Sequence, residues 1–67
     1  MEIFLNKNKI EVGKNLTLLD VLTVNGLHQK TGIAVAVNSL VIPKNKWINT
    51  KLNANDNIMV ITATAGG

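Results

Sequence analysis

The sequence lacks cysteine and arginine, and its only aromatic residues are Phe4 and Trp47. The lack of cysteine excludes disulfides, thiolate metal sites and cysteine nucleophiles from this chain. Nucleic-acid-binding proteins favour arginine for contacts to base edges and aromatic residues for stacking. Because the seven lysines are scattered along the chain, we expect a solvated surface and no nucleic-acid partner. The net charge of +3 can still attract an acidic partner protein.

The sequence also lacks any apolar run that approaches the length of a membrane span. Residues 1–6 have neither the basic start nor the long apolar stretch of a secretory signal peptide. We therefore expect a cytoplasmic protein with no membrane partner. The length of 67 residues allows for one domain, and an apolar fraction of 46% is ordinary for a folded protein.

Few residues could perform catalysis. His28 is the only histidine, and it has no companion histidine or cysteine for a zinc site. Gly13-Lys14 lacks the upstream glycine of a phosphate-binding P-loop. We interpret Asp20 as a helix cap, Asp56 as a turn residue and His28 as an exposed residue just past a helix. The prediction is a protein that binds no metal and no cofactor of its own and is not an enzyme.

Alternation of apolar with polar or small residues predicts the strands. They cover residues 2–6, 10–12, 33–38, 40–42 and 57–64. The first two flank a polar turn at 6–9 and are predicted to form a hairpin. Asn38-Ser39 forms the turn after the third strand, Pro43 stops the fourth, and a turn at 53–56 precedes the fifth.

A short helix of about two to three turns is predicted between the second and third strands. Thr17 is the expected N-cap, and Asp20 completes a weaker form of the capping box. Leu16 and Val21 have the spacing of a hydrophobic staple. The pair Asn25-Gly26 supplies the stop, since glycine is suited to a left-handed cap.

One helix in a chain of this size must cover one face of one sheet around a single core. We therefore predict an α+β protein with the β-grasp fold, in which a mixed sheet of four or five strands has the first and last strands as parallel neighbours. Trp47, the last residue of one expected helical turn at 44–47, should cap the core. The residues predicted beneath the helix are Ile3, Leu5, Val12, Leu22, Val35, Val37, Ile58 and Val60. Those predicted on the other face are Glu2, Phe4, Ala34, Ala36, Met59 and Ile61.

The chain closes with Gly66-Gly67. Glycine adopts backbone angles that are forbidden to other residues, so such an end can thread a narrow enzyme channel. An α-carboxylate is ionised at pH 7 and can attack the α-phosphate of a nucleotide held by a partner enzyme. The alternative is a frayed terminus with no function.

Four segments together resemble the ThiS family, the ubiquitin-like sulfur carriers of thiamine thiazole biosynthesis. They are Met1-Glu2-Ile3, the run Ala36-Val37-Asn38 leading to Val41-Ile42-Pro43, Trp47, and the closing Ala65-Gly66-Gly67. The resemblance covers the full chain. Two positions depart from the family pattern: Asn55 stands where glycine is usual in the last turn, and Met59 where a charged residue is common.

The resemblance implies carriage of sulfur and not catalysis. A ThiF-like adenylyltransferase would use ATP and magnesium to adenylate Gly67, and a sulfur donor such as a cysteine desulfurase would convert it to a thiocarboxylate. A ThiG-like thiazole synthase would then receive the sulfur. Residues 1–64 would form the β-grasp domain and 65–67 a flexible reactive tail, with Ala65 and Gly66 threading the partner's active site.

We predict that Phe4, Met59 and Ile61 form the partner-binding surface, because an apolar patch on an uncovered sheet face usually marks an interaction site. In the alternatives, the loop at 44–51 folds over this face, or the face forms a homodimer contact. Three function classes stay open. They are the thiamine sulfur carrier, a carrier for another pathway (molybdopterin, cysteine or tRNA thiolation), and a ubiquitin-like protein modifier or binding module.

Overall fold

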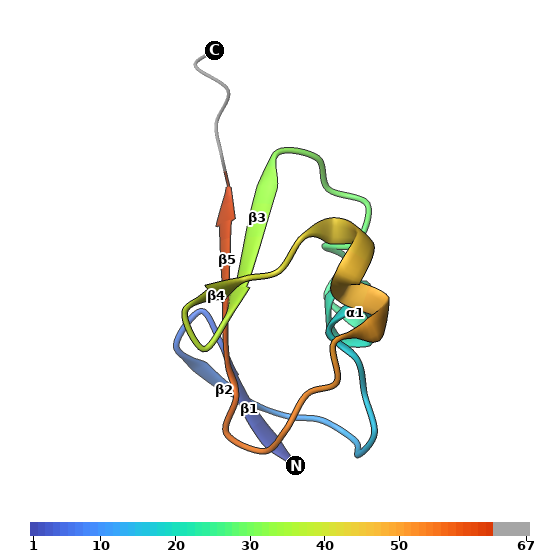
Figure 1. The fold of residues 1–67 in the computed structure, drawn as a ribbon. Helices are drawn as coiled ribbons and strands as arrows, with labels where there is room; N and C mark the ends of the chain where they lie inside the picture. The colour runs from blue at the N-terminus through green and yellow to red at the C-terminus, as the bar shows by residue number, and fades with distance from the viewer. Residues whose placement is uncertain (63–67) are drawn as a thin grey trace.

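The computed structural model describes residues 1–62, and five strands in this part of the chain form one mixed sheet (Figure 1). The sheet order is β2-β1-β5-β3-β4. β1 and β5 run parallel side by side, and the other neighbours are antiparallel. The strands are β1 (Glu2–Leu5), β2 (Asn8–Glu11), β3 (Ile33–Val37), β4 (Leu40–Val41) and β5 (Asn57–Thr62); the helical segments are α1 (Leu18–Val24) and the 3-10 helix η1 (Lys44–Asn49).

Two tight turns set the register of the outer strands. The φ angles are 50° and 73° at Asn6 and Lys7, and 51° and 71° at Asn38 and Ser39. Two consecutive residues with positive φ form the turn whose twist matches that of a hairpin, and asparagine tolerates this region better than most residues. The first turn is shorter than predicted, because β2 already begins at Asn8.

The helix N-terminus has the predicted capping box. The Asp20 amide donates to the Thr17 hydroxyl at 3.2 Å, and the Thr17 amide donates to the Asp20 carboxylate at 2.9 Å. Gly26, with a φ of 72°, reverses the chain after the helix, and the Leu27 amide then donates to the Leu22 carbonyl at 2.8 Å. A helix of 7 residues is not stable alone, so α1 depends on its packing against the sheet.

The core lies between the sheet and the two helical segments, as the alternation predicted. Ile58 is fully buried and Val60 packs against the core, so the predicted register of β5 is confirmed. The other predicted core residues are either buried or packed against the buried cluster. The buried cluster consists of Ile3, Leu18, Val21, Leu22, Val35, Trp47, Leu52 and Ile58.

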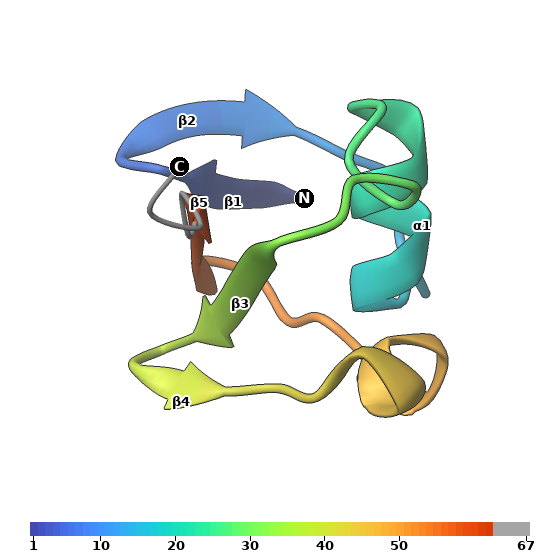
Figure 2. The same ribbon diagram turned by 90° about the horizontal axis from the view of Figure 1, so that it is seen from above.

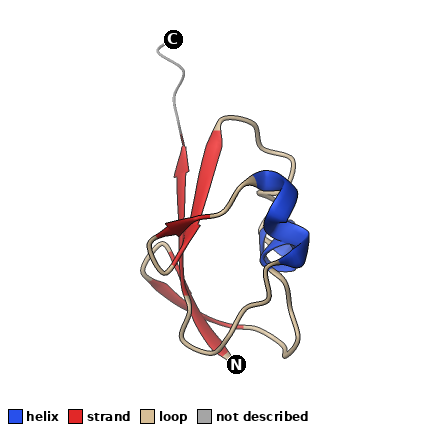
Figure 3. Ribbon diagram, in the orientation of Figure 1, coloured by secondary structure: helices blue, strands red, loops and turns tan. Residues whose placement is uncertain are grey.

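The segment that follows β4 lies on the same side of the sheet as α1 (Figures 2 and 3). It forms a six-residue 3-10 helix instead of the single turn predicted at 44–47. Trp47 is 3% exposed, and its indole N–H donates to the Ile42 carbonyl at 2.9 Å, which confirms that it caps the core. The alternative in which the loop at 44–51 covers the opposite sheet face is therefore wrong. Neither helical segment within residues 1–62 has the length and apolar character that a membrane span requires.

Candidate partner-binding face

The sheet face opposite α1 and η1 is here called the open face. Two residues that pair across neighbouring strands point to the same face, so the open face carries both members of every second pair in the register. Glu2 pairs with Glu11, and Phe4 pairs with Lys9 and, on the other side, with Asn57. Ala34 pairs with Ile61, and Ala36 pairs with both Met59 and Val41. The open face is therefore formed by Glu2, Phe4, Lys9, Glu11, Ala34, Ala36, Val41, Asn57, Met59 and Ile61.

The open face has a charged half on β1 and β2. The Lys9 ammonium lies 3.9 Å from the Glu2 carboxylate, and both side chains are at least half exposed. An exposed ion pair of this kind contributes little to stability. Its main effect is to keep this half of the face hydrated.

The other half of the open face, on β5, β3 and β4, is apolar. Met59 and Ile61 lie opposite the small side chains of Ala36 and Ala34, so the surface between the strands is hollowed. Ile61 is 55% exposed and Val41 is 64% exposed. The hollow has a volume of about 290 Å³ and is lined by Ala36, Ser39, Val41, Asn57, Met59 and Ile61.

All three residues predicted for the partner-binding surface lie on the open face. Met59 and Ile61 come together at the hollow, whereas Phe4 lies on β1 beside Asn57, between the apolar and charged halves. Phe4 and Met59 are half-buried. Val41 was missed by the sequence analysis, although the Asn38-Ser39 turn could have revealed it. A two-residue hairpin at this turn places Val41 opposite Ala36 and therefore on the same face.

A hydrogen-bond network around the buried Asp56 carboxylate holds the start of β5. Asp56 is 8% exposed, and its carboxylate accepts from the Asn53 amide at 2.7 Å and from the Asn38 side chain at 3.0 Å. The Asn38 side-chain oxygen accepts in turn from the Asn57 amide at 2.9 Å. The prediction that Asp56 is a turn residue is confirmed, and Asn38 is the partner that the sequence did not reveal.

The sequence analysis predicted that His28 is exposed. This prediction is wrong, because His28 is half-buried. Its Nδ1 atom is buried and has no hydrogen-bond partner in the part of the chain that is described. The reason is the chain reversal at Gly26, which packs Leu27 against the core and brings the next residue in with it. Asp20 acts as the helix cap, as predicted.

The predicted sulfur-carrying Gly67 and the predicted threading residues Ala65 and Gly66 lie outside the described residues. Within residues 1–62, no group of three or more histidine, cysteine, aspartate or glutamate side chains could hold a metal ion. What the described residues contribute is a scaffold whose central strand, β5, leads towards residues 63–67 and whose open face is partly apolar.

The sheet order, the parallel β1–β5 pair and the single crossover helix on one face define a β-grasp protein of the ubiquitin-like class. The family model for the ThiS family matches residues 1–67, so the chain belongs to the ThiS family. This membership places it among the sulfur carriers of thiamine biosynthesis.

Two solved structures share the fold. A crystal structure of the thiamine biosynthesis protein ThiS from Geobacter metallireducens superposes with a TM-score of 0.86 at 19% sequence identity, covering 100% of both chains. A solution NMR structure of a thiamine biosynthesis protein from Geobacter metallireducens gives a TM-score of 0.77 at 17% identity, covering 100% of this chain and 88% of the other. A comparison with curated protein sequences found no significant match.

Proposed function

We propose that this protein carries sulfur on the α-carboxyl group of Gly67 for the formation of the thiamine thiazole. The observation that carries the proposal is the family match, which extends over residues 1–67 and so includes the terminal glycines. The chain acts as a substrate and sulfur donor for other enzymes and is not itself a catalyst. A cytoplasmic location, expected from the sequence, stays a prediction.

The chemistry takes place on partner enzymes, in successive steps. In a ThiF-like adenylyltransferase, a carboxylate oxygen of Gly67 attacks the α-phosphate of ATP, and pyrophosphate leaves with magnesium. The terminal persulfide sulfur of a donor such as a cysteine desulfurase then attacks the acyl carbon, and AMP leaves. A thiol reductant cleaves the S–S bond of the resulting acyl disulfide, so the donor sulfur leaves in a disulfide with the reductant and the thiocarboxylate remains on Gly67. The resulting thiocarboxylate passes its sulfur to a ThiG-like thiazole synthase.

The open face supports this role because it offers a surface by which partners can recognise the body of the carrier. Phe4, Met59 and Ile61, together with Val41, would contact the adenylyltransferase while Ala65 and Gly66 lead Gly67 into its active site. Desolvation of the exposed Ile61 and Val41 side chains would favour the complex, since apolar area removed from water contributes about 25 cal/mol per Å². The charged half of the face would fix the orientation of the partner.

The test is transfer of sulfur between purified components. The chain is first converted with ATP, magnesium, the adenylyltransferase and a sulfur donor, and is then mixed with the thiazole synthase and its substrates. Formation of thiazole, with return of the carrier to its original mass, supports the proposal. Transfer only to a molybdopterin, cysteine or tRNA acceptor assigns the carrier to another pathway, and a stable conjugate with lysine identifies a protein modifier.

A further inference from the structure

The edge of β3 is only half covered by β4. β4 pairs with Ala36 and Val37, and the Ile42 amide adds one more hydrogen bond, of 2.8 Å, to the Val35 carbonyl. The Ile42 carbonyl does not continue the ladder, because it accepts the indole N–H of Trp47 at 2.9 Å. The chain then leaves the sheet to form η1 and uncovers the first half of β3.

This uncovered half of β3 has free backbone groups at the sheet edge. In an antiparallel strand, successive residues direct their N–H and C=O groups alternately to the two sides. The Asn38 amide donates to the Asn57 carbonyl of β5, whereas the Val35 carbonyl accepts from Ile42 on the β4 side. By the alternation, the backbone N–H and C=O groups of Val35 and of Ile33, two residues earlier, both point to the β4 side. Within residues 1–62, the N–H and C=O of Ile33 and the N–H of Val35 have no backbone partner there. An edge of this kind can pair with an extended peptide.

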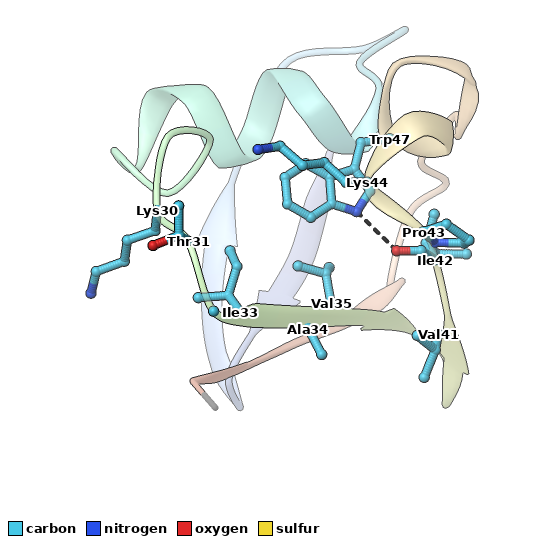
Figure 4. A pocket seen from close by; sticks show the side chains of 11 residues that line it. Lys30, Thr31, Ile33, Ala34, Val35, Val41, Ile42, Pro43, Lys44 and Trp47 are labelled. Atoms are coloured by element: carbon cyan, nitrogen blue, oxygen red, sulfur yellow. Dashed lines mark hydrogen bonds between the residues drawn. The ribbon is translucent and has the colours of Figure 1, made fainter. Parts of the chain in front are cut away.

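A pocket of about 400 Å³ lies beside the free edge (Figure 4). Ile33 and Val35 project from β3 on one side of it, and the Trp47 ring lies across from them. Pro43 and Ile42 form the wall where the chain leaves the sheet. The lining is mainly apolar, so the pocket suits an apolar side chain of a strand that pairs with β3.

The rim of the pocket is positively charged. Lys30, from the loop before β3, and Lys44, from the start of η1, both line the pocket and are exposed. None of the four acidic residues of the chain lines it. Among the described residues, no carboxylate lies within 4.0 Å of either lysine ammonium. The rim is therefore complementary to an acidic ligand.

We propose that the free edge of β3 binds an extended, acidic peptide segment of a partner protein by strand addition. The segment pairs with the backbone of Ile33 and Val35, inserts an apolar side chain towards Trp47, and places carboxylates near Lys30 and Lys44. The free backbone groups favour a peptide over a small anion, which has no means of pairing with a strand. This surface lies at the sheet edge, shares Ala34 and Val41 with the open face, and takes no part in the proposed sulfur chemistry.

The probe is an acetylated and amidated peptide of about six residues, a common strand length, with the sequence Asp-Val-Leu-Val-Asp-Asp. Binding to the isotope-labelled chain is followed through its backbone amide signals and through the fluorescence of Trp47, the only tryptophan. We expect the largest signal changes at Ile33, Val35 and the Trp47 indole. Two peptide analogues, N-methylated on alternate residues, test strand pairing, because only one of the two sets of N–H groups faces β3.

The double variant Lys30→Glu/Lys44→Glu should weaken binding at least about tenfold, since it replaces two attractions with two repulsions. The variant Lys7→Glu/Lys14→Glu, with the same net charge and with both changes outside the pocket, is the control and should bind as the parent does. Equal losses in the two variants, equal effects of the two N-methylated analogues, or signal changes centred on Met59 and Ile61 would overturn the proposal. So would a lack of binding at millimolar peptide, or a homodimer formed through the same edge without peptide.

Discussion

The side chain of Asn6 and the backbone of Val60 are joined by a hydrogen bond of 2.8 Å across 54 residues of sequence. β1 ends at Leu5, and Asn6 turns into the left-handed region with a φ of 50°. Its amide still donates to the Ile58 carbonyl at 2.8 Å, and its side-chain oxygen accepts the N–H of Val60. One side chain thus extends the support of β5 beyond the end of the neighbouring strand, in the direction of the carrier terminus.

Removal of this side chain should loosen the last part of β5. We expect Asn6→Gly, which tolerates the positive φ but has no acceptor, to lower the free energy of unfolding by about 1 kcal/mol. It should also speed hydrogen exchange of the Val60 amide more than that of Ile58. Asn6→Asp retains an acceptor oxygen and is the control. Unchanged exchange at Val60 in Asn6→Gly would show that the bond does not support the strand.

The buried carboxylate of Asp56 should be important for stability. Asp56→Ala leaves the Asn53 amide and the Asn38 side chain without their acceptor, so we expect a loss of about 2–3 kcal/mol in urea unfolding. Asp56→Asn keeps one acceptor oxygen and should lose less. If both variants unfold at the same urea concentration as the parent, the network is not a source of stability.

The open face should be needed for recognition by the adenylyltransferase. Met59→Glu places a carboxylate at the apolar hollow, where a partner would strip it of water, and we expect binding to weaken at least about tenfold. The matched control is Val24→Glu on α1, because Val24 is 84% exposed and lies on the other side of the sheet. Binding is measured by calorimetry and folding by thermal unfolding. Normal binding by Met59→Glu would show that Met59 is not in the interface. A far lower unfolding temperature of Met59→Glu, with binding of the folded variant unchanged, would show the same.

The sequence predicted those features of the fold that depend on local pattern. Thr17 and Asp20 have the spacing of a capping box, and the alternation around Ile58 and Val60 determines which face of β5 is buried. Asn55 occupies the left-handed region with a φ of 70°, so the turn forms although asparagine replaces the usual glycine. These signals lie within a few residues of one another and are therefore visible in the sequence.

Features that depend on contacts between distant segments were not predictable in this way. β4 ends before Ile42, earlier than predicted, because the Ile42 carbonyl accepts the Trp47 indole N–H. His28 is half-buried because Leu27 packs on the core. Likewise, alternation predicted that Met59 and Ile61 face outwards, but the hollow also needed Val41 from another strand. The sheet order decides which residues share a surface. The sheet order cannot be read from a local sequence pattern.

The most direct test of the sulfur-carrier account is the intact mass of the chain after incubation with ATP, magnesium, the adenylyltransferase and a sulfur donor. The account predicts a mass change equal to the replacement of one oxygen by sulfur, located at Gly67 by fragmentation. A chain with one residue added after Gly67 should show no change while keeping its fold, and Gly66→Val should react poorly because its branched side chain restricts the backbone. An unchanged mass with every partner, or sulfur located at another residue, would contradict the account.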